Sequence, residues 1–147
     1  MKPAIDIVLK TIHVGECRQV VTLGINGKDL AEKFLQKLNK DDSRKWAQMT
    51  ARIAFVSNFP TYENSQNFKS VGNGMYEFKR PGLRLYAFYD EIDGERQLIL
   101  CTNGGSRNTK KEQQADITHA KSLRQQYLAA KASLDAHFTL EALEEEE

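Results

Sequence analysis

Hydrophobic and polar positions follow two different periods along the 147-residue chain. Residues 4–12 and 19–25 are rich in β-branched side chains, which predicts two short strands that could form a hairpin. Residues 28–39 and 43–57 place apolar side chains three and four positions apart, which predicts two amphipathic helices. Because the join between these helices is so short, we expect them to pack antiparallel or nearly so.

The second half of the chain begins with a polar stretch, residues 58–71, which we expect to be a loop. The period then changes to two over residues 74–79, 83–90 and 96–102, which predicts three strands joined as two hairpins. From about residue 110 a helical period returns and predicts a long final helix. The fold class expected from this order is α+β, with a small, mainly antiparallel sheet packed on the two helices of the N-terminal half and with a C-terminal helix.

Length and composition suit one domain with a single core. Apolar residues make up 40% of the chain and charged residues 28%, which is too polar for a membrane protein and too apolar for a disordered one. The start lacks a long apolar stretch, and Cys17 and Cys101 have no metal-ligand spacing. We therefore expect a cytoplasmic protein without a metal site. Residues 1–138 would form the domain, including an N-terminal strand extension, and residues 139–147 an acidic tail.

Charge changes this picture because it is unevenly distributed. The formal net charge is +1, but residues 135–147 contain six acidic and no basic residues, so the rest of the chain carries +7. A basic body suits a polyanion such as nucleic acid, and an acidic tail could shield it. Alternatively, the basic residues simply solvate the surface and the tail aids solubility.

The hairpin expected over residues 74–90 contains the most informative charges. With its turn at residues 81 and 82, Lys79 lies opposite Arg84, and Glu77 lies opposite Tyr86. Two cations directly opposite each other destabilise a sheet unless an anion lies between them, and that anion could be Glu77 or a phosphate. Alternatively, both cations extend into water and Glu77 forms a surface ion pair, which changes stability by only about 0–1 kcal/mol.

A second basic segment lies between the last expected strand and the final helix. Gly104 and Gly105 precede Arg107, Lys110 and Lys111, so backbone N–H groups and cations could hold a phosphate there. The segment does not match the GxxxxGK[ST] pattern, and the chain contains no GxSxG, HExxH or GxGxxG motif. The same segment could equally be a flexible connection.

The order of these segments resembles the RelE/HigB-type bacterial toxins, especially the branch of phage-derived or addiction-module killer proteins. Residues 74–79 (GMYEFK) resemble the family strand G-hydrophobic-[YW]-E-hydrophobic-R, with lysine in place of arginine. Residues 83–89 (LRLYAFY) resemble the [YF]-R-hydrophobic strand that follows. Gly104, Thr109, Lys111 and residues 116–120 align with the family's third segment, so the likeness covers about residues 28–130.

The resemblance implies a RelE-like fold and the toxin of a type II toxin–antitoxin system, a ribosome-dependent mRNA endoribonuclease. Such enzymes use no metal or cofactor; they promote attack of a ribose 2′-OH on the adjacent phosphate, and a cognate antitoxin protein inhibits them. Lys79 and Arg84 would bind the phosphate and stabilise charge, and Glu77 or Tyr86 could transfer protons. The cations of the second basic segment, Arg107, Lys110 and Lys111, would bind RNA.

The third segment also departs from the family pattern. Gly105 replaces a phenylalanine, Arg107 and Asn108 replace two lysines, and Gln113 replaces a proline. These changes fall in the second basic segment, at the border of the expected site. The alternative to an enzyme is therefore a non-catalytic interaction protein on the same scaffold, of phage or mobile-element origin, that binds RNA or a host protein.

Overall fold

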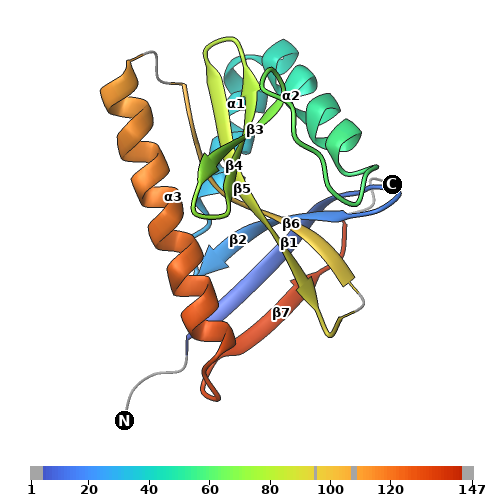
Figure 1. Cartoon of the computed structure of the whole chain (residues 1–147), viewed down its shortest axis with the longest axis vertical. Helices are drawn as coiled ribbons and strands as arrows, with labels where there is room; N and C mark the ends of the chain where they lie inside the picture. Colours follow the sequence, from blue (N-terminus) through green and yellow to red (C-terminus); the bar gives the residue numbers. More distant parts are fainter. Residues whose placement is uncertain (1–4, 95, 107–108, 144–147) are drawn as a thin grey trace.

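A seven-stranded mixed sheet forms the centre of the molecule (Figure 1). The computed structural model describes residues 5–94, 96–106 and 109–143. Its strands are β1 (Asp6–Val14), β2 (Gln19–Ile25), β3 (Phe68–Gly72), β4 (Met75–Arg80), β5 (Leu83–Ile92), β6 (Arg96–Gly105) and β7 (His137–Glu141). Its helices are α1 (Leu30–Asp41), α2 (Ser43–Val56) and α3 (Lys110–Lys131). The strands lie in the order β3-β4-β5-β6-β2-β1-β7.

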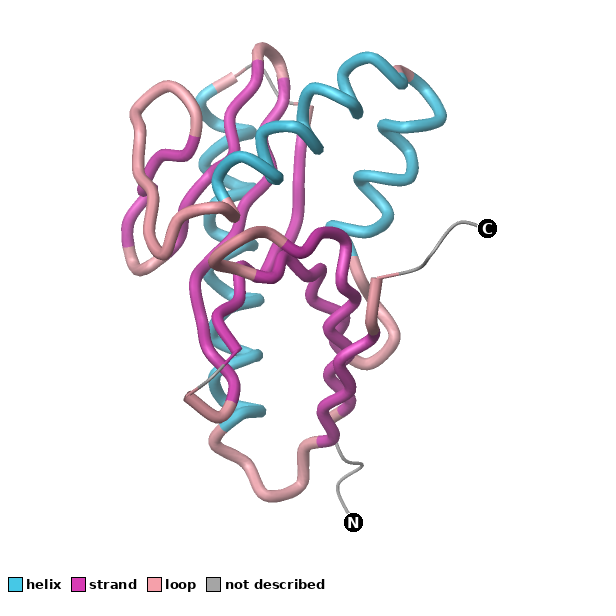
Figure 2. Tube along the Cα trace, turned by 90° about the vertical axis from the view of Figure 1, so that its right-hand side faces the viewer, coloured by secondary structure: helices cyan, strands magenta, loops and turns pink. Residues whose placement is uncertain are grey.

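The expected fold class, a RelE-like α+β fold with a small, mainly antiparallel sheet, was wrong in both the sheet and the layers. β2 pairs parallel with β6 and β1 pairs parallel with β7, while the other neighbouring strands are antiparallel. Helices α1 and α2 cover one face of the sheet and α3 covers the other, as Figures 1 and 2 show from two sides. The prediction failed because local periodicity reveals strands and hairpins, but not which distant strands pair.

The α1–α2 face carries the core that the alternation of β4 and β5 predicts. Phe78 and Leu85 of the sheet are fully buried there together with Ile53 of α2. Both helices begin at aspartates whose side chains accept a backbone N–H: Asp29 at α1 and Asp42 at α2. Such caps satisfy donors that have no partner within the helix.

The α3 face is a second core. Ala120 and Tyr127 of α3 are fully buried against sheet residues that include Met75 and Phe88. Sequence reasoning treated only one face of the β4–β5 hairpin as core, because Glu77 and Lys79 interrupt the other with charge. None of the helices in the described part of the chain combines the length and apolar character that a bilayer crossing requires.

Most local elements lie where the periods predict them, and the differences fall at the two edges of the sheet. The predicted hairpin of β1 and β2 is confirmed, as are the two helices of the first half and the long helix α3. However, β3 lies within the expected loop over residues 58–71, and β7 crosses the expected start of the acidic tail at residue 139. Both strands contain mainly exposed or half-buried side chains, so they show no clear alternation.

Candidate functional site

The β4–β5 hairpin has the register that its turn predicts. Lys79 pairs with Arg84, and Glu77 pairs with Tyr86. On the other side of β5, Arg84 pairs with Gly105 of β6. Since residues directly opposite each other share a face, the sheet brings all four expected catalytic residues together beneath the α3 side.

Arg84 and Glu77 form an ion pair that is largely buried. Nε of Arg84 lies 3.6 Å from Oε2 of Glu77, and the side chains are only 15% and 8% exposed, respectively. Nη1 of Arg84 also donates to the carbonyl oxygens of Arg80 and Leu83, at 3.1 and 2.9 Å. The anion beside the strand cations is therefore Glu77, and the pair is not the exposed surface pair considered above.

Tyr86 is fully buried beside this pair. Its hydroxyl has no hydrogen-bond partner among the described residues. Burial, together with the nearby carboxylates of Glu77 and Asp116, raises the pKa of Tyr86 to about 12, although Arg84 offsets part of this rise. The phenol therefore stays protonated at neutral pH and can donate a proton but not accept one. A buried polar group without a partner costs about 1–3 kcal/mol, and in a native protein it calls for an explanation such as catalysis.

We call Glu77, Lys79, Arg84 and Tyr86 the cluster. Asn103, which lies opposite Tyr86 on β6, fixes helix α3 over it. Nδ2 of Asn103 donates to the backbone oxygen of Asp116 in α3 at 3.1 Å, and Oδ1 accepts from the hydroxyl of Thr102 at 2.8 Å. Sequence reasoning missed Asn103, because its partner is a backbone atom of a helix that no local pattern places there. As a result, Glu77 and Tyr86 lie beneath α3, while Lys79 is half-buried.

Three further basic residues lie near the β3–β4 hairpin. Lys69 of β3 is exposed and pairs with Glu77. On α3, Lys121 and Arg124 reach the turn of the hairpin: a Cβ built on Gly72 would lie 3.9 Å from Nζ of Lys121, and one on Gly74 would lie 2.9 Å from Nη2 of Arg124. We call the four cations Lys69, Lys79, Lys121 and Arg124 the basic edge. Lys121 and Arg124 lie three positions apart, so helical periodicity could have placed them on one side of α3. The position of Lys69 could not be predicted, because the sequence did not indicate the strand β3.

The second basic segment differs from the phosphate-binding loop that the sequence suggested. Gly104 and Gly105 are paired residues of β6, and a Cβ on Gly104 would lie 2.5 Å from the ring of Phe34. Close packing therefore accounts for the glycine at position 104. Lys110 and Lys111 are exposed in the first turn of α3 and are not part of the β4–β5 hairpin that holds the cluster. Arg107 lies outside the described residues.

Within the described ranges, no group of three or more His, Cys, Asp and Glu side chains could hold a metal ion. The cluster itself brings together two cations, Lys79 and Arg84, with the carboxylate of Glu77 and the protonated phenol of Tyr86. Comparison of the chain with protein-family models, with curated proteins and with solved structures found no match.

Proposed function

We propose that the protein is the toxin of a type II toxin–antitoxin system and cleaves mRNA on the ribosome in the cytoplasm. The observation that carries this proposal is the buried Tyr86 hydroxyl, which has no partner among the described residues and lies beside the Glu77–Arg84 ion pair. The basic edge next to the cluster supplies positive charge for an RNA backbone. The resemblance of residues 74–79 and 83–89 to strand motifs of the RelE/HigB-type toxins supports the choice of mRNA as substrate and of a cognate antitoxin as partner.

The proposed cleavage is a transesterification within the RNA. Glu77 accepts the proton of a ribose 2′-OH as its oxygen attacks the adjacent phosphorus, and Lys79 and Arg84 stabilise the negative charge that develops. The bond between phosphorus and the 5′ oxygen then breaks, and that oxygen takes the proton of Tyr86. The products are a 2′,3′-cyclic phosphate and a 5′-OH end, and proton exchange with solvent restores Glu77 and Tyr86.

Access to the cluster requires a movement of α3, since Glu77 and Tyr86 are only 6% and 0% exposed. In the proposed sequence, the basic edge binds the RNA backbone first, and the first half of α3 then moves away from the sheet on the ribosome. An antitoxin that covers the basic edge would block the first of these steps.

The substitution Tyr86→Phe tests the proposal most sharply. It removes a hydroxyl that has no described partner, so it should keep or slightly raise stability, whereas loss of a general acid lowers a rate by about 10²–10⁴-fold. We expect wild-type expression in a bacterial host to arrest growth and to create new 5′-OH ends within translated messages. Tyr86→Phe, Lys79→Ala and Arg84→Ala should abolish both effects, and Lys33→Ala on the exposed side of α1 should not.

Two outcomes would contradict the nuclease. One is normal growth with soluble, folded wild-type protein. The other is retained toxicity and retained cleavage in both Lys79→Ala and Arg84→Ala.

The burial of Glu77 and Tyr86 favours one other candidate, a non-catalytic protein that uses only the basic edge to bind RNA or a host protein. Binding of an unstructured RNA oligonucleotide that Lys79→Ala weakens, with no cleavage in translating extracts, would support this candidate over the nuclease.

A further inference from the structure

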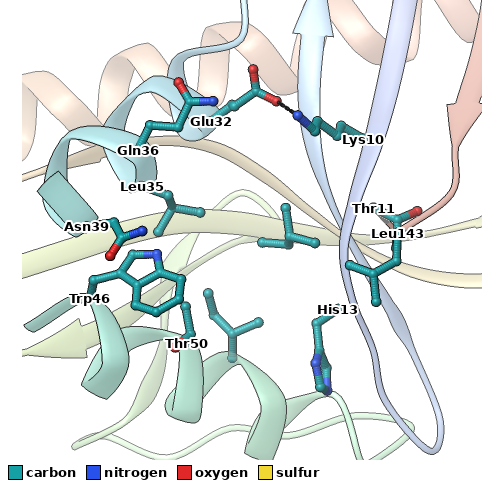
Figure 3. Close-up of a pocket in the computed structure, with 12 residues that line it drawn as sticks. Lys10, Thr11, His13, Glu32, Leu35, Gln36, Asn39, Trp46, Thr50 and Leu143 are labelled. Carbon is teal, nitrogen blue, oxygen red and sulfur yellow. Dashed lines mark ion pairs between the residues drawn. The ribbon is translucent and has the colours of Figure 1, made fainter. Parts of the chain in front are cut away.

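A cavity of about 340 Å³ lies between β1, α1 and α2, on the opposite face of the sheet from the Glu77–Arg84 pair (Figure 3). Its volume is within the range of about 300–1,000 Å³ that is typical of small-molecule sites. The buried side chains of Leu35 and Ile53 line it, which gives it an apolar floor. It shares no lining residue with the proposed nuclease site.

Two ring systems line the cavity from different elements. Trp46 projects from α2 and His13 from β1, and Figure 3 shows the two rings on opposite sides of the cavity. Both residues are half-buried, so part of each is available for contact with a ligand. Aromatic rings in such positions favour a flat ligand that can stack on them.

The polar groups at the rim are amides rather than unpaired charges. Gln36 and Asn39 lie three positions apart on α1, on one side of the helix, and both are exposed. Each amide offers a donor and an acceptor, which matches the adjacent donors and acceptors on the edge of a nucleobase. Lys10 and Glu32, which also line the cavity, form an ion pair at 2.8 Å and so neutralise each other.

We propose that this cavity binds an uncharged nucleoside, with its base stacked on Trp46 and its edge hydrogen-bonded by Gln36 and Asn39. The apolar floor accommodates the flat base, and the paired charges at the rim provide no free cation for a phosphate. The proposal does not rest on the nuclease, because the two sites occupy opposite faces of the sheet.

The chain has a single tryptophan, so its fluorescence reports on this cavity alone. The full chain is titrated with adenosine, guanosine, cytidine and uridine, with excitation beyond nucleoside absorption and with calorimetry in parallel. Purine nucleosides should quench Trp46 saturably and bind more tightly than pyrimidine nucleosides, because their larger rings stack over more area. Gln36→Ala and Asn39→Ala should each weaken binding about five- to tenfold, as expected for one lost hydrogen bond, and Gln125→Ala on α3 should not weaken it.

Three results would overturn the proposal. The first is no saturable binding of any of the four nucleosides at millimolar concentration. The second is equal affinity in wild type and in the Gln36→Ala/Asn39→Ala double variant, which would reveal nonspecific stacking on Trp46. The third is tighter binding of adenosine monophosphate than of adenosine, which would reveal phosphate recognition. Tyr86→Phe should bind nucleosides like wild type, which separates this test from that of the nuclease.

Discussion

Asp90 illustrates how burial and hydrogen bonding compete at a single carboxylate. Burial is the largest single influence and raises its pKa. Hydrogen bonds from Lys131, Tyr127 and the backbone of Glu91, together with the charge of Lys131, outweigh it, so that the pKa of Asp90 lies below its ordinary value. The hydroxyl of Tyr127 donates to Oδ2 at 2.6 Å, and Nζ of Lys131 lies 2.9 Å from the same oxygen. This carboxylate therefore joins the last turns of α3 to β5.

The lowered pKa of Asp90 predicts a dependence of stability on pH. Since the folded-state pKa lies below the unfolded value of about 3.9, the stabilisation is complete above that value and is lost as the pH falls through the folded-state pKa. We expect Asp90→Asn to lower the free energy of unfolding by about 1–2 kcal/mol near neutral pH, and by much less at the acid end. Urea unfolding near neutral pH and at a pH below the folded-state pKa of Asp90 measures the difference in the free energy of unfolding between the variant and wild type. The exposed Asp135→Asn is the control, and an equal loss at both pH values would contradict the assignment.

Gly104 gives a prediction from close packing. A Cβ at this position would lie 2.5 Å from the Phe34 ring, so Gly104→Ala must displace the ring or the strand. We expect a loss of about 1–3 kcal/mol, the usual cost of overpacking. Thermal unfolding of Gly104→Ala/Phe34→Leu should recover part of this loss, because leucine leaves room for the methyl group. No recovery in the double variant would show that another contact explains the glycine.

Sequence alone could predict the contacts that a tight turn determines. The turn between β4 and β5 sets which residues pair, and hence the positions of Lys79 opposite Arg84 and of Glu77 opposite Tyr86. It could not show that Tyr86 is covered, because the cover comes from α3, which follows in the chain and crosses the opposite face from α1 and α2.

At the scale of elements, the two edge strands are what local patterns predicted least well. A central strand is buried on both faces and has a strong apolar signal, whereas an edge strand has fewer neighbours and can remain polar. β7 has one half-buried residue, Leu140, among exposed ones, and acidic residues follow it. Its position depends on pairing with β1 across almost the whole chain, which no local window contains.

Removal of β7 should therefore destabilise the domain. Truncation after Ala136 removes the pairing with β1, the contact of Leu140 with the second core and the ring contact of Phe138 with Tyr127. We expect a loss of about 2–3 kcal/mol in the free energy of unfolding, and faster hydrogen exchange in β1. Thr139→Ala, on the same strand but exposed, should stay within about 0.5 kcal/mol of wild type. Unchanged exchange in β1 upon truncation would contradict this role of β7.

At the scale of the whole molecule, the sheet separates two kinds of surface. The basic edge lies beside the α3 face, and the cavity of Trp46 lies on the α1–α2 face. This separation arises because α1 and α2 pack on one face of the sheet and α3 packs on the other. Within the sheet, the parallel pairing of β2 with β6 places the N-terminal hairpin between the β3–β6 meander and β7. The sequence predicted β4–β6 and the N-terminal hairpin as units, but it missed β3 and could not show how the units join.

The proposed binding of RNA at the basic edge predicts a defined dependence on salt. Each phosphate of a single-stranded ligand whose charge a protein cation neutralises contributes about −0.7 to the slope of log K against log salt concentration. With four cations, we expect a slope of about −3 for an unstructured RNA oligonucleotide measured by fluorescence anisotropy. Lys79→Gln and Lys69→Gln should each reduce the magnitude of the slope by about 0.7, and Lys33→Gln should leave it unchanged. An equal reduction by all three variants would indicate diffuse attraction and no defined edge.

The pairing of β1 with β7 also bears on how the chain folds while it is being synthesised. Asp6 pairs with His137, so the strand made early has to wait until almost the whole described chain has left the ribosome before its outer side is covered. Contacts between such distant segments form slowly because a long loop must close first. Throughout that interval the outer side of β1 is an unpaired edge, which favours misassembly with other nascent chains.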